Sequence, residues 1–122
     1  MFDEALEDLK KIIDCKGAVL TDNTGDPISF FENKIGIEIR ALAKNINLIL
    51  QGMHKASDEY ALGSVQIIQV NTDHSILFSA CSGEAERIHI HLFAVFDAGA
   101  NQALAKIAIN EVIKKALILA NS

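Results

Sequence analysis

The stretch "RIHIHLFAVFD", residues 87–97, decides which kind of sheet this sequence can form. Every second residue from Ile88 to Phe96 is apolar, which is the period of a strand with one buried face. The alternate set starts with His89 and His91 but continues with a phenylalanine and a valine. A strand that becomes apolar on both faces is typical of the middle of a sheet that is covered on both sides.

Around this strand, apolar periodicity predicts helices over residues 2–14, 37–56 and 101–120, and strands over residues 18–21, 28–31, 64–71 and 75–82. Gly17 follows the first helix in the position of a helix stop. Pro27 cannot donate a ladder hydrogen bond, so the strand that follows it belongs at a sheet edge. The order α-β-β-α-β-β-β-α predicts an α+β sandwich with an antiparallel sheet between helices.

The composition excludes several classes of protein. A chain of 122 residues without a linker or repeat fits one domain, residues 1–122. The net charge of -5 argues against nucleic-acid binding, and no apolar run reaches the length of about 18 residues that membrane insertion requires. Two cysteines, Cys15 and Cys81, are too few for a disulfide scaffold. With no secretory signal at the N-terminus, we expect a cytoplasmic protein.

The helix over residues 37–56 carries a second row of small or uncharged residues, opposite its apolar core stripe. The core stripe is Ile39, Leu42, Ala43, Ile46, Ile49, Leu50 and Met53; the second row is Ala41, Asn45, Leu48 and Gly52. Strand 64–71 includes Val65 and Ile67 and has no lysine or proline to block edge pairing. Together these features predict a dimer interface, although apolar residues scattered on a surface remain the alternative.

In order and spacing, three pieces of this chain resemble the roadblock family, the dynein-light-chain and GTPase-regulator domain. The first is the leading helix that runs into "GAVLTDNTGDPIS", and the second is the single long helix followed by three strands. The third is "LFAVFDAGANQALAKIAINEVIKKAL", in which the last strand passes through a short turn into the final helix. The resemblance covers nearly the whole chain and is closest to the stand-alone prokaryotic type.

The resemblance implies a five-stranded sheet of order 2-1-5-4-3, with helices 1 and 3 on one face and helix 2 on the other. It also implies dimers formed through helix 2 and strand 3, and binding to a Ras-like small GTPase whose hydrolysis of GTP the dimer modulates without inserting an arginine finger. The docking platform of such a dimer maps here to the helix 2 residues Arg40, Lys44, Gln51 and Lys55.

No phosphate loop or nucleophile–base motif is present, so we expect no catalytic residues and no cofactor. His89 and His91 point the same way along a strand, but a zinc site needs at least one further ligand. The remaining candidates are His54, His74, Cys81, Glu84 and Glu86, and none has ligand spacing with the pair. The sequence therefore predicts no metal, with a pH response of the two imidazoles as a milder possibility.

Three functions compete at this point. The one we favour is a non-catalytic homodimeric regulatory or scaffold module for a Ras-like small GTPase. The others are a small-ligand-sensing domain of the profilin-like kind and, ranked last, a metal-dependent hydrolase using His89 and His91. The sequence leaves open whether the partner in the dimer is the same chain or another roadblock chain.

Overall fold

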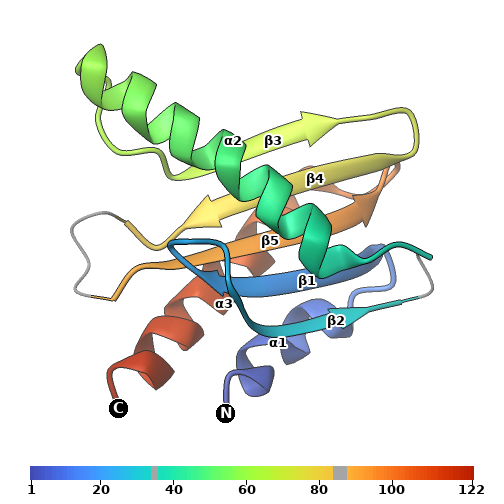
Figure 1. The fold of residues 1–122 in the computed structure, drawn as a ribbon. Helices are drawn as coiled ribbons and strands as arrows, with labels where there is room; N and C mark the ends of the chain where they lie inside the picture. The colour runs from blue at the N-terminus through green and yellow to red at the C-terminus, as the bar shows by residue number, and fades with distance from the viewer. Residues whose placement is uncertain (34–35, 84–87) are drawn as a thin grey trace.

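The computed structural model describes residues 1–33, 36–83 and 88–122. Its elements follow the predicted order: α1 (Asp3–Lys10), β1 (Cys15–Asp22), β2 (Pro27–Glu32), α2 (Ile39–Glu59), β3 (Ile67–Asn71), β4 (Ser75–Cys81), β5 (Ile90–Asp97) and α3 (Gln102–Ala120). The strands form one antiparallel sheet of order β2-β1-β5-β4-β3, which confirms the predicted topology (Figure 1). No helix in these described ranges is long and apolar enough to cross a membrane.

The sheet separates two apolar layers, with α1 and α3 on one face and α2 on the other (Figure 1). On the first face, Leu92 and Phe96 of β5 pack with residues of α1 and α3 such as Leu9 and Ile109. The residues of the second layer are Val19, Ile39, Ala43, Ile46, Phe93 and Val95. Alternate residues of β5 thus enter both layers, as the sequence predicted for a central strand.

The edge position predicted for Pro27 is confirmed, because β2 is the outermost strand beside β1. The hairpin register shifts between Leu20 and Thr21, where Thr21 comes to face Pro27. In the turn, a carboxylate oxygen of Asp22 accepts hydrogen bonds from the backbone and hydroxyl of Thr24, at 2.9 and 2.6 Å, and from the backbone of Asp26 at 3.0 Å. Burial acts to raise the pKa of Asp22, but these hydrogen bonds together outweigh it and lower the pKa.

The boundaries of several elements differ from the sequence expectation, beginning with β1, which starts at Cys15 instead of residue 18. Helix α1 ends at Lys10 rather than near residue 14, which leaves Ile13 95 % exposed in the turn before β1. Helix α2 runs from Ile39 to Glu59 instead of residues 37–56, and its expected core residues Ile49 and Met53 are exposed. Strand β3 begins three residues later than expected, and β5 begins at residue 90. Arg87, the expected first residue of that strand, lies outside the described residues.

Gly17 is a residue of β1 and not the helix stop that the sequence suggested. A Cβ atom at this position would lie 2.5 Å from Cδ1 of Ile39 and 2.9 Å from the backbone oxygen of Phe31. Ile39 is the first residue of α2 and is fully buried. The missing side chain of Gly17 therefore lets the start of α2 lie directly on the sheet.

Candidate functional site

The outer side of α2 carries the row that the sequence proposed as an interface. Its four members, Ala41, Asn45, Leu48 and Gly52, are all exposed. Leu48 is 67 % exposed, and two neighbours on the same helix extend the apolar surface, Ile49 at 52 % and Met53 at 42 %. A Cβ atom built on Gly52 meets nothing within 4 Å, so this face has room for another surface to approach.

Strand β3 forms the sheet edge next to this face, because it pairs with β4 alone among the described strands. Ile67 is partly buried against the layer that contains α1 and α3, whereas Ile68 packs toward α2. Val65 precedes the strand and is also partly buried. At this edge, Ile67 is therefore available to a second strand mainly through its backbone groups, because its side chain is partly buried.

The basic residues proposed for partner binding are exposed, and ion pairs or hydrogen bonds connect several of them to other parts of the chain. Arg40 binds the carboxylate of Glu38 through two nitrogens, at 2.9 and 3.0 Å, and its guanidinium lies 4.6 Å from the centre of the Phe30 ring. Lys44 forms an ion pair of 3.7 Å with Asp26. The amide of Gln51 donates to the backbone oxygen of Asn23 at 3.1 Å. Lys55 is exposed near the other end of the helix.

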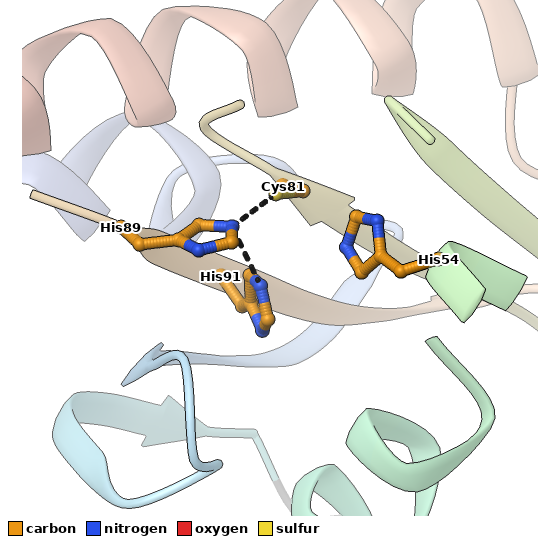
Figure 2. A group of neighbouring side chains, drawn as sticks. All are labelled: His54, Cys81, His89 and His91. Atoms are coloured by element: carbon orange, nitrogen blue, oxygen red, sulfur yellow. Dashed lines mark hydrogen bonds between the residues drawn. The ribbon is translucent and has the colours of Figure 1, made fainter. Parts of the chain in front are cut away.

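A second feature lies under α2, where His54, Cys81, His89 and His91 gather (Figure 2). His54 comes from α2 and Cys81 ends β4. His89 immediately precedes β5, and His91 is the second residue of that strand. One nitrogen or sulfur atom from each side chain lies within 4.8 Å of the others. The Nε2 atom of His89 is 2.6 Å from Sγ of Cys81 and 3.3 Å from Nε2 of His91.

His91 is the most enclosed member of this cluster, at 3 % exposure. Its Nδ1 lies 2.6 Å from Oδ1 of Asn47, a residue of α2 that is also buried. An amide oxygen only accepts, so Nδ1 must donate and Nε2 must present its lone pair to the cluster. Burial, with the neighbouring rings of His89 and His54, lowers the pKa of His91 to about 4, so this imidazole is neutral at neutral pH.

Comparison with solved structures identifies the architecture. A roadblock/LC7 domain from Streptomyces avermitilis superposes with a TM-score of 0.80 at 15 % identity, covering 95 % of this chain and 93 % of that one. The gliding protein MglB from Thermus thermophilus gives 0.81 at 18 % identity, covering 98 % and 88 %. A structure described as MglB with a tetrameric arrangement gives 0.82 at 18 % identity with the same coverage. The chain has the roadblock fold.

The sequence itself carries little of this likeness, because no protein-family model matches it and no curated protein matches it either. The roadblock resemblance inferred from order and spacing is thus supported by the arrangement of elements rather than by shared residues. Within the roadblock fold, the predicted interface residues lie on the outer face of α2, in β3 and just before it.

His54 and Cys81 are possible ligands by residue type, but no spacing in the sequence connects them with the histidine pair. The roadblock topology provides that connection, since Cys81 pairs directly with His91 across β4 and β5. His54 follows Leu50 by one helical turn, on the side of α2 that faces the sheet. His74 lies in the exposed β3–β4 turn, at the opposite end of β4 from Cys81, and Glu84 and Glu86 lie outside the described residues.

Proposed function

We propose that this protein is a homodimeric regulatory module that binds a Ras-like small GTPase, modulates its hydrolysis of GTP and has no catalytic centre of its own. The observation that carries the proposal is the exposed apolar row on α2 beside the open edge of β3, in a chain with the roadblock fold. The resemblance to roadblock domains supplies the class of partner.

Physical chemistry favours self-association at this surface. Leu48, Ile49 and Met53 lose contact with water if a second helix covers them, which contributes on the order of 1 kcal/mol each. Ala41 and Gly52 have little or no side chain, so two α2 helices can approach closely. The backbone groups of β3 can pair with a second sheet edge in the same assembly. The tetrameric arrangement described for one MglB structure is consistent with a fold that associates with itself.

We place the GTPase on the side of α2 that carries Arg40 and Lys44. Glu38 holds the guanidinium of Arg40 in one orientation over Phe30, which is itself 42 % exposed. A cation fixed beside an exposed ring gives a partner both charge and apolar contact at low conformational cost. The proposed docking platform thus presents two cations on an otherwise acidic chain, Arg40 and Lys44, each paired with an acidic neighbour.

The dimer is tested with Leu48→Glu combined with Gly52→Glu. Both positions are exposed, so the monomer should keep its helical circular dichroism while light scattering shows the mass falling from two chains to one. Leu104→Glu is the matched control, because Leu104 is a similarly exposed leucine on α3 at 61 %. A dimer that survives the double change, or one broken by the control instead, places the interface elsewhere.

The partner is tested by capture from the native lysate with the tagged protein, followed by an assay of GTP turnover by any small GTPase recovered. Arg40→Glu with Lys44→Glu should weaken capture at least about tenfold, since each reversal replaces attraction with repulsion. Lys106→Glu, an exposed lysine on α3, should leave capture unchanged. Recovery of no small GTPase, together with a monomeric mass, would contradict the proposal.

The ligand-sensing alternative gains no specific support. A sensor needs a pocket that encloses most of its ligand. The depression where β1 and β5 meet the β3–β4 turn opens to solvent, and Lys16 and Asp97 form an ion pair of 3.2 Å in it.

A further inference from the structure

We propose that His54, Cys81, His89 and His91 form a four-ligand site for a single zinc ion. The site joins the C-terminal half of α2 to the paired ends of β4 and β5. It is independent of the GTPase proposal, because none of its residues belongs to the exposed row or to the basic platform.

The donor set matches zinc chemically. Imidazole nitrogen and thiolate sulfur are the ligands of zinc in proteins, whereas magnesium and calcium require oxygen. Three of the four histidines of the chain gather at one place with one of its two cysteines. No acidic side chain takes part in the cluster among the described residues, so the assignment does not rest on surface carboxylates.

The distances are close to those of a tetrahedral site. Zinc–nitrogen bonds of about 2.0–2.1 Å place two ligand nitrogens about 3.3 Å apart. The Nε2 atoms of His89 and His91 are 3.3 Å apart. The Sγ atom of Cys81 lies 2.6 Å from Nε2 of His89, so it must move outward by about 1 Å when an ion enters between them. His54 closes the set from the α2 side (Figure 2).

Proton counting shows why an ion suits this cluster. Asn47 fixes His91 with its Nε2 lone pair inward, and the Nε2 of His89 faces both this lone pair and the sulfur of Cys81. A single proton on Nε2 of His89 cannot form well-directed hydrogen bonds to both Nε2 of His91 and Sγ of Cys81 at these distances. Zinc accepts a lone pair from each of the three atoms instead, and the thiol proton of Cys81 leaves to solvent.

The surroundings hold the ligands in place as an outer shell does in metal sites. The hydrogen bond from His91 to Asn47 sets the tautomer and orientation of that ring. The backbone nitrogen of Gly83 donates to Sγ of Cys81 at 3.3 Å, a contact that stabilises a thiolate. Beside the site, the Ser82 backbone nitrogen donates to the Ile90 oxygen and the Ile90 nitrogen to the Ser82 hydroxyl, both at 2.9 Å.

Four protein ligands favour a structural role. A catalytic zinc keeps one position for water or substrate, whereas a structural zinc has its four positions filled by the protein. The site therefore argues against the metal-dependent hydrolase considered from the sequence. Its effect is to cross-link α2, which carries the proposed dimer surface, to the strands beneath it.

The first test is a zinc titration of chelator-treated protein against a competing colorimetric chelator, with cobalt(II) as a spectroscopic probe. We expect one zinc per chain, and a cobalt complex with the strong visible bands of tetrahedral geometry and a thiolate charge-transfer band. Elemental analysis of untreated protein should find zinc. Absence of binding at one ion per chain, or a purified protein that retains copper but no zinc, overturns the proposal.

Variants separate this site from adventitious binding. Cys81→Ser should remove the charge-transfer band and weaken zinc binding at least about 100-fold, since changes outside the ligand set alone cost ten- to a hundredfold. His54→Gln, a change at the partly exposed edge of α2, should weaken binding by a similar factor and tests the site if Cys81→Ser fails to fold. Asn47→Leu should cost about tenfold while the tetrahedral spectrum persists.

His74→Gln is the matched control, because His74 is an exposed histidine outside the cluster, and it should leave binding unchanged. If zinc binds the Cys81→Ser and His54→Gln variants as tightly as the parent, or if the control weakens binding as much as they do, the assignment of these ligands is refuted.

Discussion

Replacing Gly17 with alanine is expected to destabilise the protein by about 1–2 kcal/mol, because the added methyl group lies where α2 meets the sheet. Its Cβ would lie 2.5 Å from Cδ1 of Ile39 and 2.9 Å from the backbone oxygen of Phe31. Ile39 is fully buried and cannot turn its side chain into solvent, and the Phe31 oxygen belongs to the adjoining strand.

Two opposing effects set this magnitude. Overpacking a core by one methyl group costs about 1–3 kcal/mol, whereas replacing glycine inside a strand recovers about 0.5–1 kcal/mol of backbone entropy. The overpacking cost wins because both contacts are shorter than ordinary carbon–carbon or carbon–oxygen contact. Ile39→Val alone should cost about 0.5–1.5 kcal/mol. Gly17→Ala combined with Ile39→Val should cost about 1 kcal/mol less than the two single changes added together, because valine lacks the Cδ1 atom that clashes.

Urea unfolding followed by circular dichroism measures these differences, at one fixed protein concentration because association is linked to stability. Gly99→Ala is the control, since a Cβ atom there meets nothing within 4 Å, and its stability should stay within about 0.5 kcal/mol of the parent. An unchanged stability in Gly17→Ala, or strict additivity with Ile39→Val, would refute this account of how α2 is seated on the sheet.

Three further predictions concern single side chains. Asp22→Asn should lower the free energy of unfolding by about 1 kcal/mol at neutral pH. Because folding lowers the pKa of Asp22, the difference in stability between variant and parent should shrink as pH falls below about 4. Urea unfolding of both proteins at several pH values measures this difference. The hydrogen bond from Lys115 lowers the pKa of the exposed Asp8. Lys115→Ala should therefore lower the free energy of unfolding by less than about 1 kcal/mol, and by less still in high salt. A larger loss of stability that salt leaves unaltered would disprove the surface ion pair. Burial raises the pKa of Cys15 to about 12, so this thiol should resist iodoacetamide at neutral pH until the chain unfolds. Cys81, in contrast, should be alkylated in metal-free protein and protected by added zinc. Mass spectrometry of the alkylated peptides distinguishes the two cysteines.

The edge position of β2 and the central position of β5 were predictable from single-residue chemistry, whereas the full strand order was implied by the resemblance to roadblock domains. Pro27 indicates an edge strand, and the half of β5 that is apolar on both faces indicates a central strand. Neither inference depends on the rest of the chain. The ends of elements were less predictable. Ile13 continues the apolar period of α1 but lies in the turn after it, because β1 must begin at Cys15 to pair with β5. Tertiary pairing overrides the local pattern there.

The histidine–cysteine cluster depended on relations that spacing does not contain. His89 and His91 were recognisable as a pair, but Cys81 joins them through strand register and His54 through the path of α2 across the sheet. One signal was present: Asn47 and His54 lie on the core side of α2, with Ala43 and Leu50. A polar side chain in a buried stripe requires a polar partner. Asn47 is hydrogen-bonded to His91, and the ring of His54 is stacked 6.1 Å from the ring of His91.

The pairing of β1 with β5 has a consequence for how the chain folds. The two outer hairpins, β1–β2 and β3–β4, each join neighbours in sequence and can form early, whereas β5 must bring Phe96 beside Cys15 before the sheet is complete. Contacts that close so long a loop are formed slowly. During synthesis on the ribosome, both hairpins therefore wait with open edges until β5 has emerged, and the rate at which β5 inserts between them sets the time during which the nascent chain is vulnerable to aggregation.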